Sequence, residues 1–95
     1  MLSISGEMSI YRAAELKAEL LGALDDSGPV LDVDLSEVSE LDTAGLQVLM
    51  LIKQVARQRQ IELRLQAHSP AVVEVFELLN VAAFFGDPLV IPRPD

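Results

Sequence analysis

A carboxylate, a hydroxyl and a glycine stand within four residues of one another at Asp42, Thr43 and Gly45, just before an apolar run. Asp is a residue type that accepts hydrogen bonds from the unpaired N–H groups at the start of a helix. Thr43 would then lie in the first turn, where its hydroxyl is close to the positive end of the helix dipole. Gly45 costs about 1 kcal/mol relative to Ala inside a helix, which suggests that another segment approaches the backbone there. The sequence therefore predicts a hydroxyl presented at the exposed start of a helix whose body is buried.

The run from 46 to 52 contains one polar residue, Gln47, and by itself would suit a buried strand or a buried helix. Three features favour the helix: a capping residue precedes the run, good helix formers continue through 53–58, and no turn residue interrupts before Gln60. We therefore expect a helix that begins within two residues of Asp42. On these grounds alone Thr43 is an ordinary first-turn threonine, and its functional interpretation is a modification or docking site.

Two other groups could do chemistry. Asp32 and Asp34 fall on the same face of a predicted strand, where they could form an acid–base or metal site with His68, the single histidine. No third carboxylate completes that set, and the hydroxyl of Ser69 is already accounted for as a helix cap. We interpret the aspartates as a surface pair and His68 as a loop residue, and we predict no catalytic residue, metal or cofactor. A small hydrolase using these three side chains is the rival hypothesis.

The remaining pattern predicts a layered α/β domain over residues 1–95. Residues 2–8 read as a short strand interrupted at Gly6, followed by an amphipathic helix with Ser9 as a plausible N-cap. Residues 30–35 and 61–65 alternate as strands, 36–40 form a loop, Ser69 caps a helix from 70 to about 80, and 89–91 form a last short strand. We expect a single-layer mixed β-sheet of about four strands with helices mainly on one side. The predicted core includes Leu35, Leu46, Leu49, Leu63, Leu65, Phe76, Leu79 and at least one of Phe84 and Phe85.

Composition excludes several classes of function. The sequence has no cysteine, so it has no disulfide, thiolate metal site or cysteine nucleophile. A net charge of −8 argues against a nucleic-acid partner, because phosphate binding needs clustered Lys and Arg. No signal peptide is visible, and no apolar run approaches the roughly 20 residues that span a bilayer. We expect a cytoplasmic protein that does not insert into membranes.

The segment 30–52, with its Leu-Asp-Val-Asp-Leu-Ser and Leu-Asp-Thr-Ala-Gly-Leu stretches, resembles the STAS domain of anti-sigma factor antagonists. The Gly-Glu-Met at 6–8 and the His-Ser-Pro-Ala-Val at 68–72 add to the resemblance, which covers nearly the whole chain. In that family the hydroxyl residue after the Asp accepts phosphate from a partner kinase that doubles as an anti-sigma factor. The resemblance implies a non-enzymatic regulatory module with Thr43 as phosphoacceptor.

The resemblance also implies a partner and a binding face. The partner would be an anti-sigma factor of the serine/threonine kinase type, contacted through Ser9, Ser39, Asp42, Thr43, Gly45 and Gln47. The sequence departs from the family pattern at three positions. The acceptor is Thr where many antagonists have Ser, Ala44 stands where a second hydroxyl residue is often found, and Ser9 stands where many have an acidic residue. Similar Thr-bearing STAS proteins are subunits of a phospholipid-transport ABC complex, so the ATPase of such a transporter is the alternative partner. Other members of the family resemble small scaffolds associated with chemotaxis or signalling.

Overall fold

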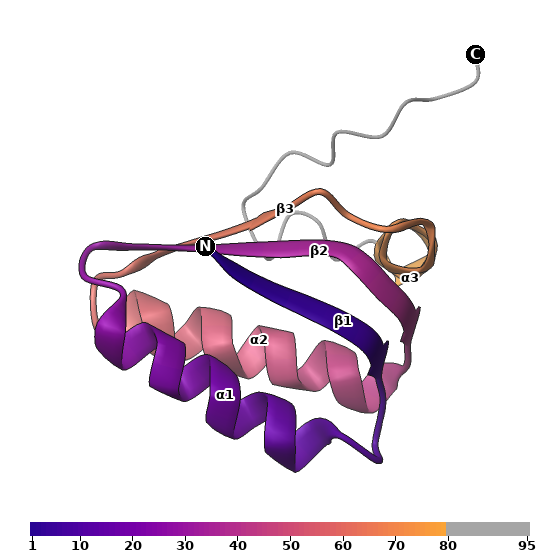
Figure 1. Cartoon of the computed structure of the whole chain (residues 1–95), viewed down its shortest axis with the longest axis horizontal. Helices are drawn as coiled ribbons and strands as arrows, with labels where there is room; N and C mark the ends of the chain where they lie inside the picture. Colours follow the sequence, from indigo (N-terminus) through magenta and orange to yellow (C-terminus); the bar gives the residue numbers. More distant parts are fainter. Residues whose placement is uncertain (80–95) are drawn as a thin grey trace.

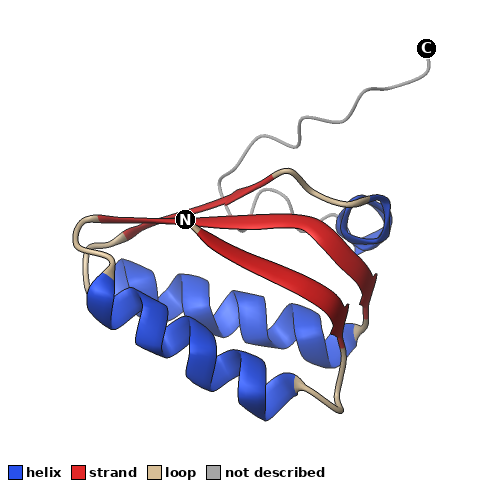
Figure 2. Cartoon of the chain, viewed as in Figure 1, coloured by secondary structure: helices blue, strands red, loops and turns tan. Residues whose placement is uncertain are grey.

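The computed structural model describes residues 1–79 of the chain, which form three strands and three helices in alternation. In chain order these are β1 (Leu2–Met8), α1 (Ala13–Asp26), β2 (Val30–Leu41), α2 (Thr43–Gln58), β3 (Glu62–Gln66) and α3 (Pro70–Leu79). The strands form one sheet in the order β1-β2-β3, and both pairings are parallel (Figure 2). The α/β class is confirmed. The sheet was predicted to be mixed, whereas its described pairings are both parallel. The predicted strand at 89–91 lies outside the described residues, as do Phe84 and Phe85.

The core lies between the sheet and its helices. Helices α1 and α2 run side by side along one face of the sheet (Figure 1). Helix α3 lies beside the bend in β2 and contacts that strand (Figure 1). Among residues 1–79, no helix combines the length and apolar character that crossing a bilayer requires. Six predicted core residues are buried: Leu35, Leu46, Leu49, Leu63, Leu65 and Phe76.

Leu79 corrects the predicted core. Its spacing places it on the same stripe of α3 as Val72 and Phe76, which are buried, yet Leu79 is 49% exposed. Helical spacing shows which face a residue occupies but not whether the neighbouring element extends far enough to cover it. Leu79 is the last residue of α3, one turn beyond Phe76.

The predicted loop at 36–40 is wrong, because β2 continues without interruption to Leu41. β1 pairs with this part of β2, but the register shifts twice, between Ser3 and Ser5 and again between Gly6 and Glu7. Each shift passes one extra residue of β2, as at a β-bulge. Buried side chains therefore recur every third residue, at Leu35, Val38 and Leu41, rather than every second. The bulges removed the alternation by which a strand is recognised in a sequence.

Ser9 does not cap α1. The helix begins four residues later, at Ala13, and its N-cap residue, Arg12, makes no side-chain capping bond. Ser9 instead closes the turn that precedes the helix: its carbonyl accepts from the Arg12 N–H at 3.0 Å and its hydroxyl from the Tyr11 N–H at 3.3 Å. Residues 9–12 therefore form a loop between β1 and α1.

Two other predicted features of helix starts are confirmed. α2 begins at Thr43 with Asp42 as N-cap, whose carboxylate accepts from the Gly45 N–H at 2.9 Å. Ser69 caps α3 by accepting from the Val72 N–H at 3.3 Å. The approach of another segment to Gly45 is also confirmed, since a Cβ on Gly45 would lie 2.1 Å from the carbonyl oxygen of Met8. The first turn of α2 therefore packs directly on the backbone at the end of β1.

We predict that Gly45→Ala destabilises the fold by about 2–3 kcal/mol or more, because the methyl group collides with backbone that cannot rotate away. The matched control is Gly22→Ala in α1, where a Cβ would meet nothing within 4 Å. That substitution should be neutral or stabilising by up to about 1 kcal/mol, since Gly weakens a helix interior. Urea denaturation of the parent and both variants measures the two effects, and equal stability of the variants would refute the packing argument.

Candidate functional site

The carboxyl ends of β1 and β2 lie at the same edge of the sheet because the two strands are parallel and adjacent (Figure 1). Met8, the last residue of β1, pairs with Leu41, the last residue of β2. The chain then turns directly into α2, and the Asp42 N–H donates to the Met8 carbonyl at 3.1 Å. The start of α2 is thus fixed to the end of β1, and the loop 9–12 leaves from the same place.

Asp42 joins three segments through its backbone and its two carboxylate oxygens. Oδ1 accepts from the Gly45 N–H at 2.9 Å in the first turn of α2, and Oδ2 accepts from the Ile10 N–H at 3.0 Å in the loop. These bonds stabilise the ionised carboxylate. The Gly45 amide is the largest cause of the lowered Asp42 pKa. The Ile10 and Ala44 amides also lower this pKa, and the three together outweigh desolvation, which raises it. The carboxylate is therefore charged, and its position is determined at both oxygens.

The predicted site residues divide into exposed and buried sets. Thr43 is exposed as the first residue of α2, and Gln47 is exposed one turn later on the same face. Ser39 is exposed near the end of β2. Gly45 and Ser9 are buried, the latter at 5% exposure, so they shape the site from beneath and offer a partner little surface.

Two further residues lie at this edge that the sequence pattern did not indicate, Ile10 and Tyr11. Both belong to the loop 9–12, with 68% and 88% of their surface exposed. In the sequence, Ile10 stands three residues before Ala13 and fits the apolar spacing of the next helix, so no local signal separated it from that stripe. We call the exposed and half-buried residues at this edge the Thr43 surface: Ile10, Tyr11, Ser39, Asp42, Thr43 and Gln47.

The rival hydrolase residues are engaged in separate contacts. Both carboxylate oxygens of Asp32 accept from the Arg64 guanidinium, at 2.8 and 3.2 Å. Asp34 Oδ1 accepts from the Ser36 N–H at 2.7 Å, and contact with Ser36 lowers the Asp34 pKa. The rings of His68 and Phe76 form an edge-to-face contact with centroids 5.5 Å apart. These contacts do not assemble the three side chains into one site.

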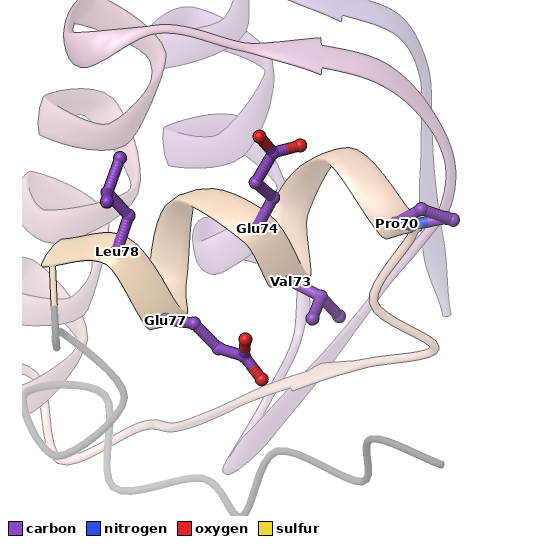
Figure 3. Close-up of a pocket in the computed structure, with 5 residues that line it drawn as sticks. All are labelled: Pro70, Val73, Glu74, Glu77 and Leu78. Atoms are coloured by element: carbon purple, nitrogen blue, oxygen red, sulfur yellow. The ribbon is translucent and has the colours of Figure 1, made fainter. Parts of the chain in front are cut away.

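A shallow depression on α3 is a second feature of the described residues that could receive a ligand. It encloses about 520 Å³ and is lined by Pro70, Val73, Glu74, Glu77 and Leu78 (Figure 3). All five residues belong to α3, and none belongs to the Thr43 surface. The lining offers two carboxylates and apolar side chains but no nucleophile or base beside them, so we do not assign the site here.

Comparison with known proteins places this geometry in a family. Residues 1–91 match the protein family described as "Mlab, STAS domain". The anti-sigma-B factor antagonist of Listeria monocytogenes is 35% identical over 79 residues, which cover 83% of this chain and 69% of that protein. The putative anti-sigma factor antagonist BtrV of Bordetella bronchiseptica is 33% identical over 82 residues, covering 86% and 71%.

A solved structure shares the fold. The unphosphorylated form of the anti-sigma factor antagonist SpoIIAA superposes with a TM-score of 0.59, covering 93% of this chain and 77% of the other. The two sequences are 17% identical, so the likeness concerns the fold alone.

The pKa of Asp42 leads to a prediction about acid stability. A carboxylate whose folded-state pKa lies below its ordinary value of 3.8 stabilises the fold fully above that value and loses the contribution as pH falls through the lowered pKa. Asp42→Asn should therefore be less stable than the parent at pH 7, and the gap should narrow from about pH 4 downward. The Asp34 contribution is present in both proteins and cancels in this comparison.

Urea denaturation at about pH 7, 4 and 3 measures the gap across the range in which this linkage acts. Asp26→Asn is the matched control, because it makes the same change in charge at the exposed end of α1. A stability gap for Asp42→Asn that stays constant across this range would show that its carboxylate does not hold the site together.

Proposed function

The chain belongs to the STAS domain family, and from this membership we propose that it is a cytoplasmic, non-enzymatic regulatory module that binds an anti-sigma factor. We further propose that residues 1–95 act as a single domain, that the partner is a serine/threonine kinase, and that the contact is made through the Thr43 surface. Two relatives named anti-sigma factor antagonists support this role.

One observation carries the proposal: Thr43 is exposed at the first position of α2, while the groups around its backbone are held in place. The Asp42 carboxylate caps the helix and also fixes the loop, and Gly45 packs on Met8 beneath it. A kinase can therefore reach the Thr43 hydroxyl without opening the fold. The same exposure makes Thr43 available to a partner that binds without modifying it.

Phosphorylation of Thr43 would change the surface more than the fold. A phosphate adds about −1.5 to −2 charges and three acceptor oxygens. At a helix N-terminus that charge is favourable by roughly 0.3–1 kcal/mol. Next to the Asp42 carboxylate it also places two anionic groups side by side in the middle of a docking surface. Burying that charge against a partner without a matching cation would be unfavourable by far more than the stabilisation that the helix dipole provides.

The ATPase of a phospholipid-transport ABC complex is the second candidate partner. Two observations favour it over a role as a signalling scaffold: the acceptor is Thr rather than Ser, and the matching family is described by the name Mlab. In this case Thr43 would contact the ATPase directly, without any need for phosphate. Purification of the tagged chain from its native cell, with mass spectrometry of bound proteins, separates the two: a kinase supports the first proposal and transport subunits the second.

We predict that Thr43 acts as a switch in partner binding. Thr43→Ala should retain the fold and bind the partner constitutively, as tightly as the unmodified parent. Thr43→Asp and the kinase-treated protein should bind at least about tenfold more weakly. Calorimetric titration with the purified anti-sigma factor measures the affinities, and thermal melts of the same four samples should show intact folding. Equal affinity across all four samples would leave Thr43 as a structural first-turn residue.

A further inference from the structure

Ile10 and Tyr11 are large apolar side chains held in solvent on a hydrogen-bonded backbone. Their N–H groups are both bonded, that of Ile10 to Asp42 Oδ2 at 3.0 Å and that of Tyr11 to the Ser9 hydroxyl at 3.3 Å. Their side chains are nonetheless 68% and 88% exposed, next to the start of α2. The loop is therefore built around fixed backbone positions while its two largest apolar side chains contribute little to the core.

Arg12 fixes the loop from its other end. Its Nη1 donates to the carbonyls of Ser5 and Glu7, both at 2.8 Å, across the bulge at Gly6. Gly6 has a φ of +82°, and a Cβ there would lie 3.2 Å from Nη1, so the bulge and the guanidinium fit one another closely. With the Arg12 N–H bonded to the Ser9 carbonyl as well, the loop is closed at both ends.

This arrangement suits an interface. Ordering a loop during association weakens binding, because the lost conformational freedom must be offset by the new contacts. A loop that is ordered before binding avoids that loss. Tyr in particular brings a large contact area with few rotatable bonds, and Tyr is over-represented among the residues that dominate interface energies.

The charges around the loop indicate what the partner offers. Glu7 and Glu40 are directly paired on β1 and β2 near the carboxyl edge of the sheet, and Asp42 follows two residues after Glu40. Like charges at paired positions of adjacent strands repel one another in the isolated protein. Arg12, the basic residue of the loop, directs its Nη1 to backbone carbonyls and its Nη2 to Glu15 at 3.8 Å. The rim of this edge is consequently acidic.

We propose that Ile10 and Tyr11 are the apolar contact of the partner interface, and that they enter an apolar pocket bordered by Lys or Arg on the anti-sigma factor. This inference rests on the proposed function, and it adds a chemical description of the partner's side of the contact. Thr43 then controls binding beside an apolar contact that supplies much of the affinity.

The first test compares Tyr11→Ser and Ile10→Ser with Leu78→Ser in calorimetric titrations with the purified anti-sigma factor. Leu78 is the matched control, because it is 79% exposed on α3 and lies outside the Thr43 surface. Tyr11→Ser should weaken binding at least about tenfold, Ile10→Ser several-fold, and Leu78→Ser less than about twofold, with unchanged thermal melts. Tyr11 is the single tyrosine, so fluorotyrosine labelling gives one ¹⁹F resonance that should shift on binding.

The outcomes separate this inference from the proposed function. Weaker binding by Thr43→Asp together with unchanged binding by Tyr11→Ser would overturn the apolar contact and leave the proposed function standing. An equal loss for Leu78→Ser would also overturn it, since the effect would not be local. If the unmodified chain binds no anti-sigma factor, the proposed function fails and this inference fails with it.

The acidic rim is tested by Glu40→Lys in association kinetics at low and high salt. Reversing the charge should slow association several-fold at low salt and reduce its dependence on salt, because rim charges act mainly on the association rate. Glu62→Lys, at the exposed amino end of β3, is the control and should have a smaller effect. Unchanged or faster association of Glu40→Lys would contradict a basic border on the partner.

Discussion

The two hydrogen bonds of the Asp42 carboxylate are the interaction on which this surface depends. One oxygen holds the first turn of α2 and the other holds the loop between β1 and α1, so a single side chain fixes Thr43 relative to Ile10 and Tyr11. The close contact of Gly45 with the Met8 carbonyl brings the helix near enough for both bonds to form. Because the parallel pairing ends β1 and β2 at the same edge, these local contacts join Ile10 and Asp42, which are 32 residues apart in the chain.

Sequence reasoning succeeded where short-range chemistry determines structure. Asp42 and Ser69 were identified as helix caps because their side chains bond to amides three residues ahead. Gly45 was identified as a point of close approach because Gly is otherwise unfavourable in a helix. The physics of the residues alone left Thr43 as an ordinary threonine, and the resemblance to a family supplied its predicted role.

The failures have long-range causes. Residues 36–41 form a strand only because β1 lies beside them, and the two bulges in that pairing conceal the alternation of their side chains. The exposure of Ile10 and Tyr11 was not predicted, because it depends on where α1 begins, and the position of Ser9 suggested an earlier start. Leu79 has the spacing of a core residue but lies where that face is not fully covered. Each case depends on a neighbouring segment that the local pattern does not contain.

The most direct measurement is a ¹⁵N NMR titration of the chain with the purified anti-sigma factor, which follows the backbone amides of all these segments at once. We expect the largest changes to fall on Ile10, Tyr11, Thr43 and Ala44, with α3 little affected. Changes concentrated on α3, around the depression lined by Glu74 and Glu77, with the amides of Ile10 and Thr43 unmoved, would contradict the assignment of the Thr43 surface as the partner interface.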